Sequence, residues 1–366
     1  MNSIRVLVVD DSAFMRNIIG QMLAGAPDIR VVGQATNGKE GLKMARELKP
    51  DVITLDVEMP VLGGLEMLTI LMRTNPMPVI MLSSLTQEGA DITIKALQLG
   101  AVDYLPKNAH GGAMAMRRLA PQLIEKVRAV GTGETRKAIS EVRGMVPEFF
   151  DHSQRRNPEH TGRAADVPVV AIGCSTGGPA ALCEVIPQLP EGLNCAVVVA
   201  QHMSATFTRA LATRLDRLSR SLTVREAEEG ARLEAGTVLV APGGKHMTVD
   251  RKMDGSLICH LSTTPDMPAQ PSVDVLFASL AKSCPETTLG VVMTGMGTDG
   301  MQGSHTLTQR GGQVIAQAPP GCLVYGMPKA VVDAGLAHTV APLGRIAKEI
   351  YMWSRVGRGT RTGAPG

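Results

Sequence analysis

The sequence has few aromatic residues, almost no excess of one charge and no long apolar run. Phe, Trp and Tyr make up 2% of the 366 residues, so side chains on which nucleic-acid bases stack are scarce. The 37 Lys and Arg residues nearly balance the 34 Asp and Glu residues, and a net charge of +3 does not suggest a basic surface. No apolar run approaches the roughly 20 residues that span a membrane. We therefore expect neither a nucleic-acid partner nor direct insertion into a membrane.

The six cysteines also lack the patterns of metal-binding or redox-active sites. All lie in the second half of the chain, without a C-x-x-C pair and without a histidine at metal-ligand spacing. The first residues, MNSIRVLVVDD, place acids where a signal peptide has its apolar segment. These features favour a reducing compartment, and we expect a cytoplasmic protein.

The length and the composition predict two doubly wound α/β domains. Domains commonly hold about 100 to 200 residues, and 44% hydrophobic residues suffice for packed cores. In residues 1–130, short apolar runs alternate with amphipathic stretches, which favours a parallel sheet covered by helices on both faces. We expect the strands at residues 4–10, 29–35, 51–56, 77–84 and 102–107.

A polar segment separates the first domain from a second one. Residues 131–166 are rich in polar residues, Pro and Arg, so we expect a linker whose middle part is compatible with a short helix. Residues 167–355 repeat the α/β pattern and predict a second, mostly parallel sheet. Its strands are expected at residues 167–173, 194–201, 237–243, 288–295 and 311–317. The ending, residues 356–366, is expected to be disordered.

Carboxylates follow two strands of the first predicted sheet. Asp10 and Asp11 follow the first strand and Asp56 ends the third, so the three acids converge at the carboxyl edge of a parallel sheet. Mg²⁺ prefers such oxygen ligands, and the backbone carbonyl of Glu58 is a further candidate ligand. The sequence therefore predicts a magnesium site in this pocket.

Two further polar groups are expected at the same edge, Ser83 at the end of the fourth strand and Lys107 after the fifth. Each residue alone has an ordinary structural explanation, because acids at strand ends often cap helices and lysines are often solvated. Together, the acids, the hydroxyl and the amine suit a phosphoryl group on Asp56.

The first domain resembles the response-regulator receiver family over roughly residues 4–130, through the motifs VVDDS, LDVEMP, LSS and DYLPK. This resemblance implies a flavodoxin-like fold in which Asp56 takes a phosphoryl group from a phosphohistidine of a partner histidine kinase. It also implies that Asp10 and Asp11 help to hold Mg²⁺, and that Ser83 and Lys107 contact the phosphoryl group.

A serine in the second domain has the surroundings of a catalytic nucleophile. Ser175 lies in GCSTGGP between a predicted strand and a helical stretch, as in the G-x-S-x-G turn that exposes a nucleophile. The glycines permit close backbone approach, and the helix N-terminus favours a developing oxyanion. The alternative is a glycine-rich phosphate cradle, although neither of the usual nucleotide-binding patterns occurs at this turn.

A base and an acid are expected at the same edge. His202 ends the next strand in VVVAQHM, and Asp299 follows the strand TLGVVM in TGMGTDG. His246 in APGGKHM is a rival base, and a histidine at a strand end is often only structural. The segment GMGTDG also fits the dinucleotide-binding fingerprint, but no acid follows about 20 residues later to bind a ribose.

The second domain is similar to the catalytic domain of the chemotaxis protein-glutamate methylesterases over about residues 167–350. The resemblance rests on AIGCSTGGP, QHM, PGGKHM, QPSVDVLF, TGMGTDGMQG and YGMPKAV. It implies a Rossmann-like domain with Ser175 as nucleophile, His202 as general base and Asp299 as the acid that orients the base.

The same resemblance implies supporting roles. Backbone amides near Met296 are candidate oxyanion donors, Thr176 supports Ser175, and ester hydrolysis needs no cofactor. Members of the family often have a small residue such as Ala in place of Cys174, which we expect to pack as a small hydrophobic residue.

We therefore expect a phosphorylation-regulated serine hydrolase that demethylates glutamate methyl esters on the cytoplasmic helices of chemoreceptors and releases methanol. Protein-glutamine deamidation is an alternative, because the same residues can release ammonia from an amide. A two-component transcription regulator is a third interpretation. It is disfavoured, because a helix-turn-helix output domain would be smaller, helical and basic.

Overall fold

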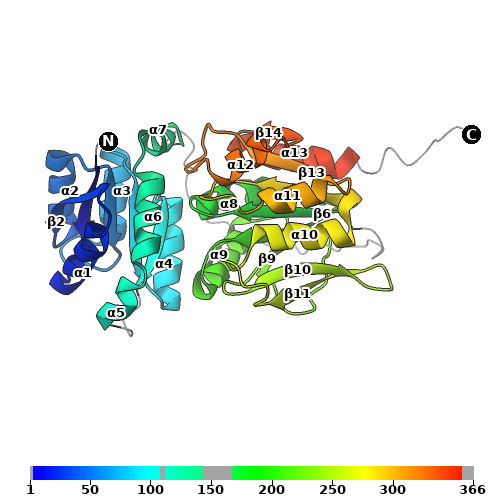
Figure 1. Ribbon diagram of the computed structural model, residues 1–366, viewed down its shortest axis with the longest axis horizontal. Helices are drawn as coiled ribbons and strands as arrows, with labels where there is room; N and C mark the ends of the chain where they lie inside the picture. Colours follow the sequence, from blue (N-terminus) through cyan, green and yellow to red (C-terminus); the bar gives the residue numbers. More distant parts are fainter. Residues whose placement is uncertain (1–2, 108–111, 143–166, 357–366) are drawn as a thin grey trace, which may run out of the picture. The chain divides into compact units, whose positions relative to one another are not determined.

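The computed structural model describes residues 3–107, 112–142 and 167–356, which belong to two compact α/β units (Figure 1). The division between the units falls after residue 148. Most of the predicted linker, residues 143–166, and the predicted disordered tail from residue 357 on lie outside the described residues. Among the helices described, none is both long and apolar enough to cross a membrane.

The first unit is built on a five-stranded parallel sheet with the strand order β2-β1-β3-β4-β5. This is the strand order of flavodoxin-like folds, so the predicted fold class is confirmed for this unit. Each of the five apolar runs in the sequence forms one strand. The strands are β1 (Ile4–Val9), β2 (Ile29–Ala35), β3 (Val52–Asp56), β4 (Val79–Ser84) and β5 (Asp103–Lys107).

Helices cover this sheet, with α1 packed beside α5 and α6, and α3 packed between α2 and α4 (Figure 1). Ser12, Asn37 and Thr86 begin α1, α2 and α4, because each side chain accepts a hydrogen bond from a backbone N–H of the first turn. The helices are α1 (Ala13–Ala24), α2 (Gly38–Leu48), α3 (Gly64–Thr74), α4 (Gln87–Gln98), α5 (Gly112–Arg117), α6 (Ala120–Val130) and α7 (Gly133–Val142).

Helix α7 lies within the segment that the sequence predicts to be a linker. Ala138 and Ile139 on this helix are buried. Two adjacent apolar residues are too few to give the periodicity by which a helix is recognised in a sequence.

The second unit contains a seven-stranded sheet in which every neighbouring pair of strands is parallel. Its strand order is β14-β13-β12-β6-β7-β9-β8, which is the Rossmann order except for the added edge strand β8. The strand order reverses between β6 and β12, and the predicted fold class is confirmed for this unit as well. The strands are β6 (Val169–Cys174), β7 (Ala196–Gln201), β8 (Thr223–Glu226), β9 (Thr237–Val240), β12 (Thr288–Val292), β13 (Gln313–Gln317) and β14 (Thr339–Ala341).

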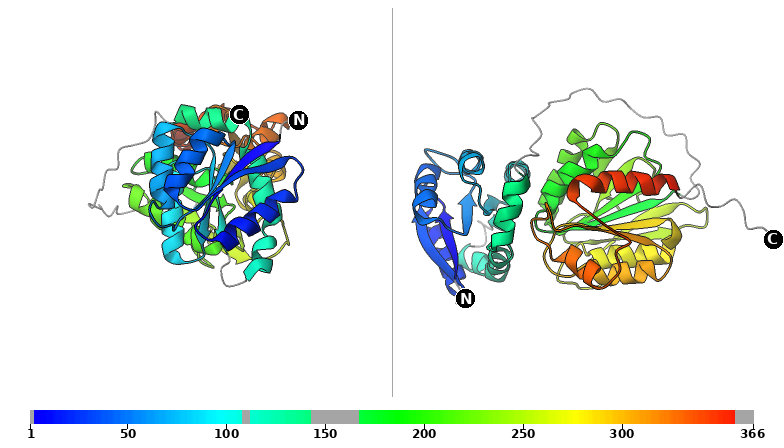
Figure 2. Two further views of the ribbon diagram at one scale, coloured as in Figure 1. Left: turned by 90° about the vertical axis from the view of Figure 1, so that its left-hand side faces the viewer. Right: turned by 90° about the horizontal axis from the view of Figure 1, so that it is seen from above.

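Two layers of helices cover this sheet, as Figure 2 shows in its right-hand view. α8 packs against α9 and α13 in one layer, and α11 packs against α10 and α12 in the other. The hairpin of β10 (His246–Arg251) and β11 (Leu257–Ser262) packs against α10. The helices are α8 (Gly178–Val185), α9 (Ala205–Leu218), α10 (Val273–Ser283), α11 (Met301–Thr308), α12 (Met327–Asp333) and α13 (Leu343–Val356).

Four strands of the second unit are absent from the sequence-based expectations, namely β8, β10, β11 and β14. β8 and β14 are edge strands of four and three residues, and exposed positions interrupt their apolar pattern. β10 and β11 form a hairpin outside the main sheet and end in exposed or half-buried polar residues. Such strands lack the continuous apolar run by which buried strands are recognised.

Phe277 on α10 is fully buried in the core of the second unit. Gly290 of β12 gives it room, because a Cβ atom on that glycine would lie 2.8 Å from the ring. Gly303 of α11 approaches the same side chain equally closely. The ring therefore joins β12, α10 and α11, the elements next to which Asp299 lies.

We expect Phe277→Ala to lower the free energy of unfolding of the second unit by about 3–5 kcal/mol, because the removed ring leaves a cavity. Calorimetry on the full chain measures this loss. Met253→Ala is the control, since that side chain is fully exposed. A loss below about 1 kcal/mol for Phe277→Ala would contradict the packing described.

Candidate functional sites

Ser175 lies directly after β6, in the turn that leads into α8. Its N–H donates to the carbonyl of Thr294 at 3.0 Å, and its carbonyl accepts from the N–H of Gly178 at 2.8 Å. Gly177 has a φ of +79°, a backbone conformation that favours glycine. The strand–turn–helix context that the sequence predicts is thus present, and the side chain of Ser175 is only half-buried.

His202 and Asp299 form a close pair beside this turn. Nε2 of His202 lies 2.7 Å from Oδ2 of Asp299, and both side chains are mostly buried. Because a carboxylate only accepts hydrogen bonds, Nε2 carries the proton, and Nδ1 keeps its lone pair. Among the described residues, no hydrogen bond joins the Ser175 hydroxyl to the His202 ring. Such bonds often form only when substrate is present.

Asp299 is held by the N-terminus of α10. Its two oxygens accept from the N–H groups of Val273 and Asp274 at 2.7 and 2.9 Å and from the Ser272 hydroxyl at 3.0 Å. Burial opposes ionisation of this carboxyl group, but the hydrogen bond from His202 and the backbone donors outweigh it and lower its pKa to about 2. Asp299 is therefore an ionised acceptor for the His202 ring at neutral pH.

Asp274 is a second carboxylate at the same helix end. Its Oδ1 accepts from the N–H groups of Gly300 and Gly303, at 2.8 and 2.6 Å, and so ties the N-terminus of α11 to α10. Burial, opposed by the N–H of Gly303 and reinforced by the charge of Asp299, raises the pKa of Asp274 to about 6. Ser272 and Asp274 lie in the motif QPSVDVLF, whose pattern assigns neither of them a role, and only the fold brings them to Asp299.

His246, the rival base, is fully buried and occupied at both ring nitrogens. Nδ1 accepts from the N–H of Ser272 at 3.1 Å, and Nε2 lies 2.9 Å from the carbonyl of Pro265, to which it therefore donates. This histidine supports the residue whose hydroxyl binds Asp299. It has no free nitrogen with which to accept a proton.

The loop after β12 lies against the turn that carries Ser175. A Cβ atom on Gly295 would lie 2.9 Å from Cβ of Ser175, so only glycine allows this approach. Within the part of the chain that is described, no hydrogen bond from the backbone N–H of the next residue, Met296, is found, and its role as an oxyanion donor stays a prediction. Thr176 is buried, and its carbonyl accepts from the Thr294 hydroxyl at 2.9 Å.

The acids that the sequence predicts for the first unit lie together. One carboxylate oxygen each of Asp10, Asp11 and Asp56 falls within 4.8 Å of the others. Lys107 places its ammonium group 2.7 Å from both Asp10 and Asp56. Burial raises the pKa of Asp56 to about 6, against the opposing effect of Lys107. The pocket thus concentrates hard oxygen ligands of the kind that Mg²⁺ prefers.

The structure gives less direct support for Ser83 and Glu58 as members of this pocket. The Ser83 hydroxyl is buried and donates to the carbonyl of Gly89 at 3.0 Å in this structure. The side chain of Glu58 is exposed, and the predicted ligand is its backbone carbonyl. Arg16 has no place in the sequence-based expectations, and it donates to the carbonyls of Asp10 and Asp11, at 2.8 and 2.9 Å.

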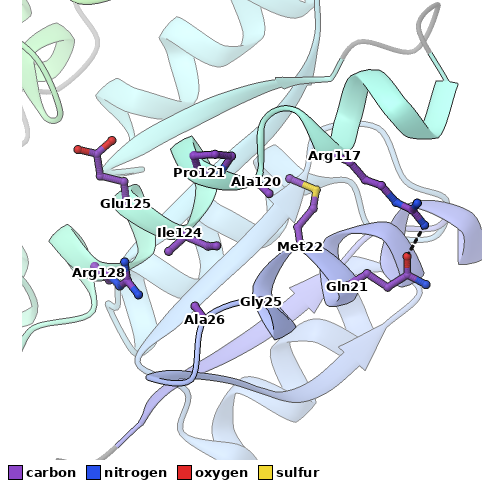
Figure 3. Close-up of a pocket in the computed structure, with 10 residues that line it drawn as sticks. All are labelled: Gln21, Met22, Gly25, Ala26, Arg117, Ala120, Pro121, Ile124, Glu125 and Arg128. Carbon is purple, nitrogen blue, oxygen red and sulfur yellow. Dashed lines mark hydrogen bonds between the residues drawn. The ribbon is translucent and has the colours of Figure 1, made fainter. Parts of the chain in front are cut away.

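An open groove on the first unit runs between α1 and α6 (Figure 3). Met22, Ala26 and Ile124 lie along it, and Arg117 donates to Gln21 at 2.7 Å at one end. None of the residues that line this groove belongs to the sites predicted from the sequence.

The chain matches two protein families. It matches the response regulator receiver domain over residues 6–117 and the family described as CheB methylesterase over residues 170–350. A "Protein-glutamate methylesterase/protein-glutamine glutaminase" of Desulfitobacterium hafniense is 44% identical, with 95% of this chain and 96% of that protein covered. A protein of the same name from Pyrococcus abyssi is 40% identical, with 95% and 92% covered.

Among solved structures, the second unit is similar to the CheB methylesterase catalytic domain of Thermotoga maritima. The TM-score is 0.50 at 38% identity, and the match covers 51% of this chain and 99% of that domain. The similarity to known proteins therefore extends over both units and covers nearly the whole length of these two relatives.

We expect Asp274→Asn to be tolerated or stabilising near pH 7, because an amide oxygen accepts the same two N–H groups without a second charge. The pKa of Asp274 is raised from 3.8 to about 6, so the unfolded chain ionises more readily. Stability of the natural protein should therefore fall as pH rises through this range, and less so in the variant. Denaturant unfolding at about pH 4 and pH 7 measures the difference, and a variant that loses more stability at the higher pH would contradict the expectation.

Proposed function

Since the chain belongs to the protein-glutamate methylesterase/protein-glutamine glutaminase family, we propose that it hydrolyses glutamate methyl esters on the cytoplasmic helices of chemoreceptors. Ser175 is the nucleophile, His202 the general base and Asp299 the acid that orients the base. The observation that carries this proposal is the 2.7 Å contact between His202 and Asp299 at the strand ends that also present Ser175. It supplies an oriented imidazole with a free Nδ1 lone pair.

The first half of the reaction transfers the glutamyl group to the enzyme. The Ser175 oxygen attacks the ester carbonyl while Nδ1 of His202 takes the hydroxyl proton. The carbonyl oxygen becomes an oxyanion that accepts from the N–H of Met296. When the tetrahedral intermediate collapses, the C–O bond to the methoxy group breaks, and the proton on Nδ1 leaves with methanol.

The second half of the reaction regenerates the free serine. A water molecule gives one proton to Nδ1 and attacks the glutamyl ester, and the bond to the Ser175 oxygen then breaks as the serine recovers its proton. The product is a free glutamate carboxylate. Throughout, Asp299 stays ionised and stabilises the imidazolium that forms on His202 twice per turnover.

Deamidation of glutamine is the second candidate function, because the printed names of the relatives include both activities. The same attack on a carboxamide releases ammonia in place of methanol, with Nδ1 of His202 protonating the leaving group. Parallel assays of methanol and ammonia release separate the two reactions.

The first unit supplies the regulation in this proposal. Asp56 accepts a phosphoryl group from a phosphohistidine of a partner kinase, and the ammonium group of Lys107 contacts the phosphoryl oxygens, as does the Ser83 hydroxyl after it leaves Gly89. Asp10, Asp11 and Asp56, with the carbonyl of Glu58, would hold Mg²⁺, which when bound would neutralise charge on the transferring group. The resulting phosphoaspartate changes the rate at which the second unit turns over.

We expect Ser175→Ala, His202→Ala and Asp299→Asn each to lower kcat for a methyl-esterified receptor fragment by about 10³-fold or more, with combined losses far from additive. Methanol release measures the effect. Asp266→Asn, at an exposed acid, is the control. Turnover by Ser175→Ala close to that of the natural protein would show that another group is the nucleophile.

We expect Asp56→Asn to abolish Mg²⁺-dependent phosphorylation by a small phosphodonor such as acetyl phosphate, together with the change in methanol release that phosphorylation causes. Intact-mass measurement detects the phosphoryl group. Asp51→Asn is the matched control, because Asp51 lies beside the opposite end of β3 and binds the N–H of Arg5 at 2.8 Å. A phosphoryl group retained after Asp56→Asn would mean that another residue accepts it.

A further inference from the structure

The side-chain amide of Gln201 bridges the backbones of the two residues that react. Gln201 is the last residue of β7, and its side chain is buried. Its Nε2 donates to the carbonyl of Ser175 at 3.0 Å and to the carbonyl of His202 at 3.1 Å. A single planar group thus contacts both the turn that presents the nucleophile and the segment that presents the base.

The amide lies where the regular pairing of β6 and β7 ends. Cys174 and Gln201 are register partners, and the N–H of His202 still donates to the carbonyl of Cys174 at 3.1 Å. Beyond this point the strands turn away toward their helices. The Gln201 amide adds a side-chain contact between the two segments here, since it reaches the carbonyl of Ser175.

The thiol of Cys174 fixes the orientation of the Gln201 side-chain amide, that is, on which side its oxygen and its nitrogen lie. Its Sγ lies 3.1 Å from Oε1 of Gln201, and burial raises the pKa of the thiol, which therefore remains a donor. Two carbonyls need donors on one side of the amide, and the thiol supplies one on the other. Only one orientation of the amide satisfies all three contacts. Gly178 closes the remaining side, because a Cβ atom there would lie 2.0 Å from Oε1.

We propose that Cys174 and Gln201 form a positioning clamp that sets the distance between the Ser175 oxygen and the His202 ring. This proposal rests on the roles proposed above for Ser175 and His202. The clamp touches no substrate. It acts by holding two peptide groups whose displacement by about 1 Å would separate nucleophile and base, which costs on the order of 10²-fold in rate.

Gln201→Glu tests the donor function of the amide with almost no change in shape. An ionised carboxylate donates to neither carbonyl, whereas a protonated one donates to a single carbonyl. We expect kcat for a methyl-esterified receptor fragment to fall about 10- to 100-fold near neutral pH, with KM little changed. The deficit relative to the natural protein should shrink as pH is lowered.

Cys174→Ala and Cys174→Ser test the thiol. The alanine variant leaves Oε1 without a donor, and we expect a several-fold loss of kcat, of which the serine variant restores most because its hydroxyl also donates. Cys195→Ala is the matched control, since Cys195 is buried and lies beside the opposite end of β7. It should lower the thermal midpoint without lowering kcat.

The outcomes decide between a clamp and ordinary packing. Equal kcat for Cys174→Ala, Cys174→Ser and Cys195→Ala would overturn the proposal, as would a kcat and pH profile of Gln201→Glu that match those of the natural protein. If Gln201→Glu does not fold, the cysteine series decides alone. Undiminished turnover by Ser175→Ala would instead contradict the proposed nucleophile, and with it any catalytic role for the clamp.

Discussion

The carboxylate of Asp299 is the point on which the geometry of the second unit depends. Backbone N–H groups from the start of α10, together with the Ser272 hydroxyl, hold both of its oxygens, and one of these oxygens also receives Nε2 of His202. These donors are fixed by the helix, so the protein itself supplies preorganised hydrogen bonds to the charge. When Nε2 of the His202 imidazole contacts Asp299, Nδ1 is the ring nitrogen that remains to accept a proton. The direction in which Nδ1 points therefore decides where the oxygen of a nucleophile has to lie.

The parallel sheet explains why the three residues meet at all. β6 lies between β7 and β12, and each of these strands ends at the same edge, where the loops carry Ser175, His202 and Asp299. The strand order reverses between β6 and β12, and this reversal point is where doubly wound folds generally place their ligands. The first unit uses the same rule, since β1, β3 and β5 bring Asp10, Asp56 and Lys107 together at one edge.

The sequence is enough to predict the strand-end acids, the serine and the histidine. Each of them follows an apolar run, and the direction of that strand is known once the sheet is parallel. Residues that act across the gaps between elements cannot be predicted in this way. Ser272 and Asp274 reach Asp299 only because α10 begins beside it. In the sequence, Gln201 looks like an ordinary polar residue at the end of a strand. Cys174 packs in the core as expected, but its thiol also has a specific acceptor that apolar patterning does not reveal. The edge strands are missed because they bury too few apolar residues to produce a period, whereas α7 overlaps the start of the linker's middle part, which the sequence shows to be compatible with a short helix.

The two functional carboxylates show how the same side chain is prepared for opposite tasks. Asp299 and Asp56 are both largely buried, and burial alone raises the pKa of each. Asp299 is surrounded by donors, which lower its pKa to about 2 and keep it ionised beside His202, as its proposed role requires. Asp56 has one backbone donor, the N–H of Val57, and faces a second acid, so its pKa rises to about 6 despite Lys107. Lys107 supplies one positive charge to the acids of this pocket, and an external cation would supply further positive charge to them. Surplus donors thus suit a carboxylate to hold a base in place, and a deficit of donors suits one to bind an ion and react.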